Sequence, residues 1–414
     1  MLPVSDFIEV ARSRGSGEAL RAGAPRRFAG SGEHAPVIIW NVCMHCNMTC
    51  PHCYAAAVSE PSPTDLSSEE ALGLLDQMAA CGVKIVIFSG GEPLLRGDLL
   101  DLMAHAKSLG ISPQLSSNGV LIDEKVAAAL KERGVDYVGV SVDGMRDFND
   151  DYRGMEGGTE AALRGLRCAK AAGMRTGLRM TLTSRNVAQL PEMVEVARGV
   201  EVDRFYVSHL VYSGRGFKVS DEDLTRDVAR ETLTRLFEIA ERNLIADEGP
   251  RVTTGSNDSD GPFLLRWIEA RYGAEAAAPV EELLVQRGGN SAGERILNID
   301  ARGRVHPDQF WRAAVLGDVR KQSFAEILEH PMRDELRGRT ERLTGRCADC
   351  SYKPICRGSH RERALALYRD PWAPDPACVM EDAEIGVVST AQPTAQSTAQ
   401  PAAGSHENTG KEVA

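Results

Sequence analysis

The chain has 414 residues, 43% of them hydrophobic and 26% charged, which is enough for one large domain or for a catalytic domain with an extension. Its 48 basic and 59 acidic side chains give a formal net charge of −11, which argues against a general nucleic-acid or anionic-membrane binder. No apolar run reaches the roughly 18 residues that span a bilayer, and the N-terminus lacks the layout of a secretory signal. We therefore expect a cytoplasmic protein with no nucleic-acid or membrane partner.

Strand-like and helix-like segments alternate along the first half of the chain. Residues 1–35 are rich in Gly, Ala and Arg with little periodicity, which predicts a flexible N-terminal lead-in. Between residues 36 and 215, short apolar runs alternate with amphipathic stretches of helical period. The predicted strands are Val37–Trp40, Lys84–Phe88, Ser112–Leu115, Tyr137–Val142, Thr176–Leu182 and Arg204–His209. The predicted helices are Glu69–Ala80, Leu99–Ser108, Glu124–Arg133, Glu160–Ala172 and Val187–Arg198.

Six β-α units in sequence predict an α/β fold with a parallel sheet and right-handed crossovers. Six units are too few to close an eight-stranded barrel, so we expect a partial (β/α)6 barrel of TIM type at residues 36–215, with its site at the C-terminal ends of the strands. Beyond it we expect a helical linking or substrate region at 216–295, a metal-binding extension at 296–388 and a disordered polar tail at 389–414.

The ten cysteines are concentrated at two places in the chain. Four lie within residues 43–53, four lie within residues 347–378, and Cys81 and Cys168 stand apart. Two tight clusters in a chain expected to stay reduced predict two metal sites rather than a disulfide framework. Thiolates are soft ligands that suit iron–sulfur clusters or zinc.

The first cluster is the run Cys46-Asn-Met-Thr-Cys50-Pro-His-Cys53-Tyr54, directly after the first predicted strand. Three cysteines on a four-iron cube would leave one iron open to another ligand. The Cys-x3-Cys-x2-Cys spacing resembles the radical S-adenosylmethionine (SAM) superfamily. That resemblance implies a [4Fe–4S] cluster on Cys46, Cys50 and Cys53, SAM on the fourth iron, and Tyr54 near the adenine. The residues alone also allow a zinc site using Cys43, His45 or His52, but no matching ligand pair follows nearby. We interpret Cys43 as a spare thiol.

Further motifs follow the next predicted strands. The turn Ser89-Gly-Gly-Glu-Pro93 carries two glycines that permit close backbone approach and a carboxylate that can accept from an ammonium group. Similarity to the superfamily implies that Gly90, Gly91 and Glu92 bind the amino group of SAM. It also implies that Ser117, Asn118, Ser141 and Arg179 contact the ribose and carboxylate of SAM. The Asn118-Gly119 and Asp143-Gly144 pairs are otherwise ordinary turn chemistry.

The second cluster consists of Cys347, Cys350, Cys356 and Cys378, a Cys-x2-Cys-x5-Cys-x21-Cys pattern. Four such ligands could close a structural zinc site or complete a second, auxiliary [4Fe–4S] cluster, and the spacing does not choose between them. Together with the first cluster, the pattern resembles the C-terminal extension of radical SAM proteins of the SPASM/Twitch type. The resemblance implies an auxiliary cluster in this extension.

Longer blocks in the C-terminal half resemble the NirJ family, the radical SAM proteins of heme d1 biosynthesis. They include Phe205–Gly216, Thr254–Trp267, Asn298–Asp308 and Cys356–Ala364. The resemblance spans roughly residues 36–387 and implies removal of propionate side chains from 12,18-didecarboxysiroheme, a modified tetrapyrrole. The usual Cys-x-Gly-Asn-Thr-Arg of that family is here Cys356-Arg-Gly-Ser-His-Arg, a departure next to the second cluster.

Within these blocks, His209, Arg215 and His306 are our candidates for contacts to substrate carboxylates or iron, because Arg and His suit both. Asn257, Asp258 and Asp260 are interpreted as a cap on the helix that follows.

The same resemblance implies that a reduced cluster cleaves SAM to a 5′-deoxyadenosyl radical, with electrons from a flavodoxin or ferredoxin-type donor. Within the superfamily, the alternatives are a siroheme-derivative deacetylase, a coproheme decarboxylase or a maturase of a ribosomal peptide. From another class, the alternative is a non-catalytic iron–sulfur electron carrier. A carrier predicts full ligation of both clusters, whereas the first set offers three cysteines.

Overall fold

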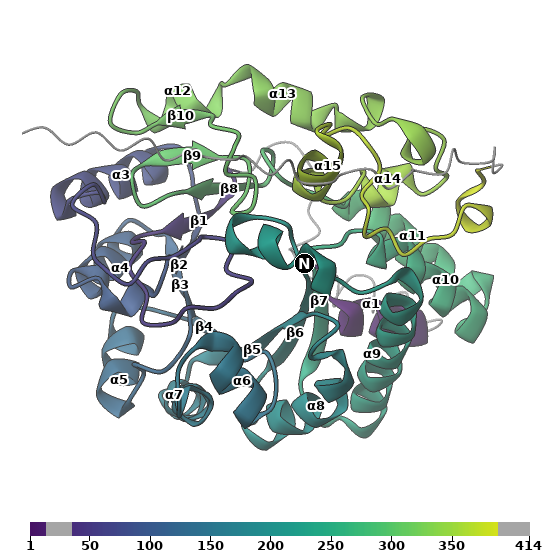
Figure 1. Ribbon diagram of the computed structural model, residues 1–414, viewed down its shortest axis with the longest axis horizontal. Helices are drawn as coiled ribbons and strands as arrows, with labels where there is room; N and C mark the ends of the chain where they lie inside the picture. The colour runs from purple at the N-terminus through teal and green to yellow at the C-terminus, as the bar shows by residue number, and fades with distance from the viewer. Residues whose placement is uncertain (14–34, 388–414) are drawn as a thin grey trace, which may run out of the picture.

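The computed structural model describes residues 1–13 and 35–387, whose strands form one curved sheet with helices along its outer side (Figure 1). The ten strands lie in the order β10-β9-β8-β1-β2-β3-β4-β5-β6-β7. The pairs from β8 through β7 are parallel, and β8, β9 and β10 pair antiparallel. The expected α/β partial barrel is confirmed.

The strands are β1 (Val37–Asn41), β2 (Ile85–Ser89), β3 (Ser112–Ser117), β4 (Tyr137–Ser141), β5 (Arg175–Leu182), β6 (Arg204–His209), β7 (Arg251–Gly255), β8 (Ile296–Ile299), β9 (Arg304–His306) and β10 (Gly317–Asp318). The helices that follow the strands of the sheet are α3 (Ser68–Ala80), α4 (Leu99–Ser108), α5 (Glu124–Glu132), α6 (Arg146–Arg153), α7 (Gly158–Ala171), α8 (Leu190–Gly199), α9 (Arg226–Ala246), α10 (Asp260–Tyr272) and α11 (Ala274–Arg287). The C-terminal part adds α12 (Phe324–Leu328), α13 (Pro331–Arg337), α14 (Lys353–Cys356) and α15 (Arg361–Tyr368).

The apolar pattern of the strands explains the layering. In β1, Ile38 and Trp40 are fully buried, and Trp40 packs on Phe88 of β2 with ring centroids 5.8 Å apart. These side chains belong to one hydrophobic core between the sheet and the outer helices. Helix α3 begins at a capping box, in which Ser67 accepts from the Glu70 backbone N–H while the Glu70 carboxylate accepts from that of Ser67. The alternating faces of the strands leave polar side chains for the concave side.

The sheet continues past both predicted boundaries of the barrel. Strand β7 lies in the region expected to be a helical linker (216–295), and it pairs in parallel with β6. Strand β8 lies in the expected extension (296–388), and it pairs in parallel with β1. The predicted boundaries at 215 and 295 therefore fall within one continuous sheet. The run Arg251-Val-Thr-Thr-Gly255 escaped notice because it is short and largely polar.

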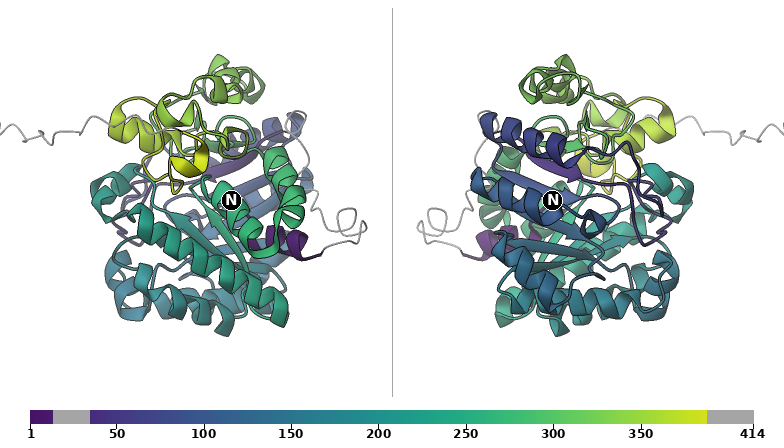
Figure 2. Two further views of the ribbon diagram at one scale, coloured as in Figure 1. Left: turned by 90° about the vertical axis from the view of Figure 1, so that its right-hand side faces the viewer. Right: turned by 90° about the vertical axis from the view of Figure 1, so that its left-hand side faces the viewer.

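The N-terminus differs from the predicted lead-in. Residues Val4–Arg12 form helix α1, which packs against α9 and α11 (Figure 2), and Leu2 pairs with Thr254 at the edge of β7. Phe7 and Ile8 are fully buried in the main core. A single amphipathic helix of 9 residues, without neighbouring periodic segments, gave too weak a period to predict. The rest of the lead-in (14–34) and the predicted tail (389–414) lie outside the described residues.

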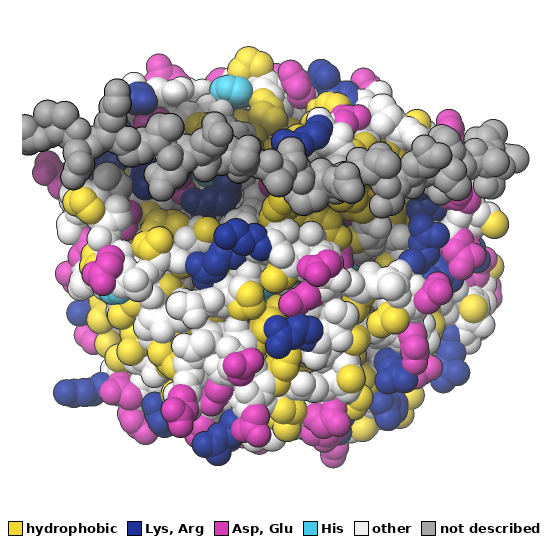
Figure 3. All heavy atoms as spheres, viewed as in Figure 1, with side chains coloured by type: hydrophobic (Ala, Val, Ile, Leu, Met, Phe, Trp, Pro, Cys, Tyr) yellow, Lys and Arg dark blue, Asp and Glu magenta, His cyan; other side chains and the backbone are white. Residues whose placement is uncertain are grey.

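The visible surface mixes charges of both signs. Figure 3 shows Lys and Arg side chains interspersed with Asp and Glu over this face of the molecule. Among the helices of residues 1–13 and 35–387, none is long and apolar enough to cross a membrane.

Candidate functional site

The first cysteine cluster lies in the loop between β1 and α3. Cys46, Cys50 and Cys53 are half-buried and unpaired. Burial raises the pKa of the Cys46 thiol to about 11 and also raises the pKa of Cys50, which Arg153 opposes. Three partly accessible soft donors within eight residues fit an iron–sulfur cluster, whose irons would replace the thiol protons. Cys43 is buried apart from them and donates to the Glu92 carbonyl oxygen at 3.3 Å, which agrees with its interpretation as a spare thiol.

The Gly-Gly-Glu turn after β2 holds this loop by its backbone. The N–H of Gly91 donates to the Cys43 carbonyl at 2.8 Å, and the N–H of Glu92 donates to the His45 carbonyl at 2.7 Å. A Cβ on Gly90 would stand 2.6 Å from the Cys43 carbonyl oxygen, and a Cβ on Gly91 would overlap that of His45. The two glycines are therefore required by the close approach of the cysteine loop itself.

The Glu92 carboxylate meets protein donors rather than the open site. It is fully buried and accepts from Ser117 Oγ at 2.8 Å, the Asn118 N–H at 2.8 Å and the Leu94 N–H at 3.1 Å. Burial raises its pKa to about 7 against the effect of these bonds. Both oxygens are engaged by protein donors, and a contact of this carboxylate with an ammonium group stays a prediction. Its bonds join the ends of β2 and β3.

Glu92→Gln is expected to lower the free energy of unfolding by about 1–3 kcal/mol, because one amide oxygen replaces two acceptors for three buried donors. Denaturant unfolding of the variant, compared with Glu69→Gln on the exposed first turn of α3, measures this difference. Equal stability of Glu92→Gln and the control would contradict the assigned role.

Tyr54 is fixed at the strand ends. Its hydroxyl lies 3.1 Å from Asn41 Nδ2 and 3.3 Å from Ser89 Oγ, at the ends of β1 and β2. Its ring meets Phe310 edge-on, with centroids 5.3 Å apart. The aromatic side chain predicted to lie beside an adenine thus stands on the concave side of the sheet, next to Cys53.

The remaining predicted SAM contacts fall into two groups. Ser117 and Asn118 gather with Glu92 at the end of β3, and Asn118 Nδ2 donates to Asn47 in the cysteine loop at 2.7 Å. Ser141 and Arg179 are register partners on β4 and β5, so they share one face. Arg179 reaches across Gly139 to donate to Ser116 Oγ at 2.6 Å, while its buried Nε has no partner. That donor remains free for an anionic group.

Arg215, which is predicted to contact substrate, donates hydrogen bonds to two backbone carbonyls of the cysteine loop. Its Nε donates to the Cys50 carbonyl at 2.8 Å and its Nη1 to the Ala57 carbonyl at 2.5 Å. Arg96 assists from the other side by donating to the Val42 carbonyl at 2.9 Å. Arg215 reaches these carbonyls because it lies in the 3₁₀ segment Gly214–Glu222, and its contact with substrate stays a prediction.

The two predicted substrate histidines are both engaged with acids. His306 is fully buried between the Ala314 carbonyl at 2.7 Å and Asp300 at 3.4 Å, contacts that hold it in the structure, and its contact with substrate stays a prediction. His209 Nε2 lies 3.1 Å from Asp260, and both groups are buried. Burial opposes protonation of His209, but the Asp260 carboxylate outweighs it and raises the pKa of the imidazole. Asp260 is therefore both the first residue of α10 and the partner of His209, whose Nε2 it engages.

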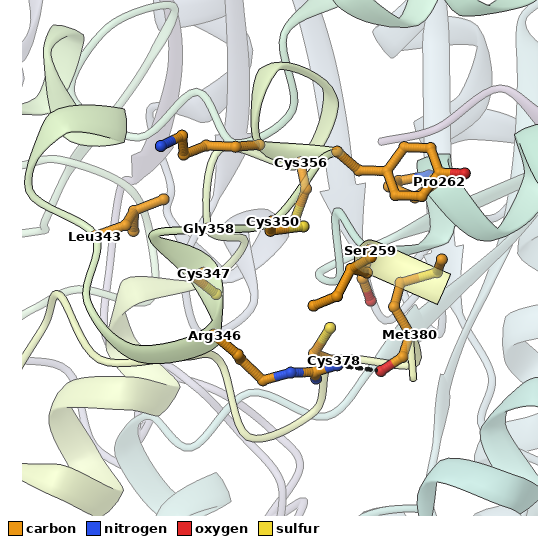
Figure 4. A pocket seen from close by; sticks show the side chains of 13 residues that line it. Ser259, Pro262, Leu343, Arg346, Cys347, Cys350, Cys356, Gly358, Cys378 and Met380 are labelled. Carbon is orange, nitrogen blue, oxygen red and sulfur yellow. Dashed lines mark hydrogen bonds between the residues drawn. The ribbon is translucent and has the colours of Figure 1, made fainter. Parts of the chain in front are cut away.

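The second cysteine cluster lines one cavity (Figure 4). Cys347, Cys350, Cys356 and Cys378 all border it, with Ser259 and Pro262 of the α10 region closing one side. Burial raises the pKa of Cys347 to about 11 and that of Cys356 well above its usual range. Figure 4 shows the four sulfurs around a common space. Within residues 1–13 and 35–387, no His, Cys, Asp or Glu trio converges as it would on a single metal ion. Four cysteines that border one cavity are a donor set that an iron–sulfur cluster can use.

Two residues beside the cysteine clusters were not among those predicted from the sequence. Arg153, at the end of α6, lies 3.9 Å from Cys50 Sγ, and His360 meets Phe310 edge-on at 5.2 Å. The Arg at the C-terminal end of an acidic helix and the His at the departure after Cys356 were the available signals.

The comparisons with known proteins cover almost the whole described chain. A family model described as the radical SAM superfamily matches residues 40–197, and one described as an iron–sulfur cluster-binding domain, SPASM, matches residues 291–351. The chain is 40% identical to pre-heme d1 synthase of Dinoroseobacter shibae over 368 residues, 88% of this chain and 91% of that one. It is also 40% identical to Fe-coproporphyrin III synthase of Methanosarcina barkeri over 362 residues, 86% and 90% of the two chains. The fold is similar to that of native anSMEcpe with bound AdoMet, with a TM-score of 0.65, 18% identity, and 83% and 93% of the two chains covered.

Proposed function

Because this chain belongs to the radical SAM superfamily and carries a SPASM iron–sulfur domain, we propose that it removes the propionate side chains of 12,18-didecarboxysiroheme in heme d1 biosynthesis. The chain is a radical SAM enzyme of heme-related biosynthesis, as its family and its relatives, 40% identical over most of their length, show. The observation that carries the finer proposal is the similarity to pre-heme d1 synthase, which covers 88% of this chain and 91% of that one.

The residues of the first site have defined tasks in this proposal. Cys46, Cys50 and Cys53 would hold a [4Fe–4S] cluster, and the Gly90–Glu92 turn, Ser141 and Arg179 would receive SAM. When bound, these groups supply one-electron chemistry that yields a hydrogen-abstracting carbon radical. The protein fixes the loop through Arg215 and the Gly-Gly-Glu turn, and it positions the Tyr54 ring. The second set would hold the auxiliary cluster, and a flavodoxin or ferredoxin-type protein would supply electrons.

A row of rings connects the two cysteine regions and supports a substrate space between them. Tyr54 meets Phe310 at 5.3 Å, and Phe310 meets His360, four residues after Cys356, at 5.2 Å. His360 is 7% exposed and its Nδ1 has no partner. Burial, then the charge of Arg363, lowers its pKa, so the imidazole is neutral at pH 7, the form that ligates iron. The Nδ1 of His360 and the Oε2 of Glu362, both without a protein partner, could contact a polar ligand such as an iron tetrapyrrole.

Burial and the nearby Asp308 carboxylate raise the pKa of Glu362 to about 8, so its acid is also mostly protonated at pH 7. A neutral carboxylic acid can donate a hydrogen bond to a substrate carboxylate. The carboxylate of a propionate side chain could accept such a bond.

One second candidate has equal support from identity. Fe-coproporphyrin III synthase is also 40% identical, which favours removal of acetate rather than propionate side chains as the alternative. A cytoplasmic location belongs to the same proposal, because all ten cysteines are unpaired and cluster assembly needs reduced thiols.

Turnover of a single substrate separates these candidates. The reconstituted full-length enzyme is incubated anaerobically with SAM, dithionite and 12,18-didecarboxysiroheme, and the product is identified by mass spectrometry. We expect the loss of two propionate chains, and no reaction by the Cys46→Ala/Cys50→Ala/Cys53→Ala variant. Loss of two acetate chains would establish the alternative, and an unaltered tetrapyrrole in the presence of SAM cleavage would exclude both.

A further inference from the structure

A buried triad joins the first cysteine loop to the ends of β4 and α6. Asp143, fully buried just after β4, accepts from Arg153 Nη2 at 2.6 Å and lies 2.9 Å from His52 Nε2. Its other oxygen accepts from the Thr181 N–H at 2.8 Å. Arg153 ends α6, and His52 stands between Cys50 and Cys53 in sequence. The carboxylate therefore fixes two nitrogen-bearing side chains beside the cysteine loop.

Further contacts prevent these side chains from turning away. The His52 ring stacks on Tyr152 with centroids 5.0 Å apart and planes 10° apart. Tyr152 in turn stacks on Phe148 at 5.1 Å. The Thr49 N–H donates to the Arg153 carbonyl at 3.0 Å, which ties the end of α6 to the loop before Cys50. These contacts fix the orientation of the His52 and Arg153 side chains, as a preorganised site requires.

Two nitrogens of this triad have no protein partner. Arg153 Nε and His52 Nδ1 are buried and unpaired, and Arg153 Nη1 lies 3.9 Å from Cys50 Sγ. A buried guanidinium N–H without an acceptor is destabilising, so such a donor in a native site indicates a missing acceptor. The acceptor chemistry at this place is sulfur, namely the Cys50 thiolate and the sulfides of the cluster that the loop would hold.

We propose that Arg153, oriented by Asp143 and His52, donates hydrogen bonds to the sulfurs of the first cluster and thereby raises its reduction potential. Hydrogen bonds to cluster sulfurs stabilise the reduced, more negative state and are one of the means by which proteins set these potentials. By raising this potential, Arg153 favours transfer of an electron to the first cluster before SAM is cleaved. The inference rests on the iron–sulfur assignment made under the proposed function, but not on the identity of the substrate.

Redox titration followed by electron paramagnetic resonance tests this role. The signal of the first cluster is recognised because it changes when SAM is added. In Arg153→Met we expect the equilibrium constant for reduction of that cluster to fall at least tenfold, about 59 mV for a one-electron couple. Arg185→Met is the matched control, because Arg185 lies over the Phe148 and Tyr152 rings and is 46% exposed. Its potential should equal that of the wild type.

Arg153→Met leaves Asp143 with one partner fewer, so Arg153→Met/Asp143→Asn is measured beside it to remove both buried charges together. The same lowered potential in the double variant is expected. An unchanged potential in a variant that retains about four irons at the first site would overturn the proposal. Failure of the wild-type protein to hold iron there would instead overturn the iron–sulfur assignment, so the two failures are distinguishable.

Discussion

Anaerobically reconstituted wild-type protein is expected to contain about eight irons per chain, and replacing all three of Cys46, Cys50 and Cys53 by alanine should leave about four and abolish cleavage of SAM. The reason is that these three thiols, held by the Gly-Gly-Glu turn and by Arg215, are the donors of the site that resembles the SAM-binding centre. Iron and sulfide analysis with chromatography of 5′-deoxyadenosine measures both effects.

The matched variant is Cys347→Ala/Cys350→Ala in the second cavity. It should also fall to about four irons, but it should still cleave SAM, because its change lies among the residues of the auxiliary site. Zinc at the second site, or retention of SAM cleavage in the first variant, would contradict the assignment of the two sites.

Arg363→Ala is expected to destabilise the protein by about 3–5 kcal/mol, the cost of leaving a buried carboxylate unpaired. Arg363 and Asp375 are at most 1% exposed and form a two-pronged pair with bonds of 2.8 and 2.7 Å. Arg363 Nη1 also donates to the Leu210 carbonyl at 3.0 Å and the Ser256 carbonyl at 2.7 Å, after β6 and β7. One guanidinium therefore ties α15 and the second cysteine region to the barrel.

Anaerobic denaturant unfolding followed by circular dichroism measures the apparent change in the free energy of unfolding. Arg342→Ala is the control, since Arg342 is 47% exposed and lies over the Trp372 ring at 5.6 Å from its centroid. We expect its effect to stay within about 1 kcal/mol. A similar small loss for Arg363→Ala would show that the buried pair does not join the two regions.

The strands of the barrel were predictable because apolar runs bounded by turn residues recur between amphipathic segments. Predicted Arg204–His209 coincides with β6, and predicted Leu99–Ser108 coincides with α4. Strand β7 was not predictable from its polar residues, since its burial comes from neighbours such as β6 and α1 that are distant in sequence. Helix α1 likewise depends on packing against α9 and α11.

The sequence predicted which residues form the site, but it did not predict which groups their side chains contact. The spacing of Cys46, Cys50 and Cys53 and the Gly-Gly-Glu turn placed them at adjacent strand ends, where the structure has them. Which polar group Arg215, His306 or Glu92 would meet depended on how distant loops fold back. No local pattern records the position of the Cys50 carbonyl, Asp300 or Ser117 relative to these side chains.

The transfer of hydrogen from substrate to SAM tests the central claim most directly. The enzyme is given 12,18-didecarboxysiroheme deuterated in its propionate side chains, with SAM and dithionite, and 5′-deoxyadenosine is analysed by mass spectrometry. We predict that the 5′-deoxyadenosine carries deuterium when the propionates are labelled and none when only the acetates are. Deuterium from labelled acetates alone, or unlabelled 5′-deoxyadenosine while product forms, would contradict propionate-directed radical chemistry.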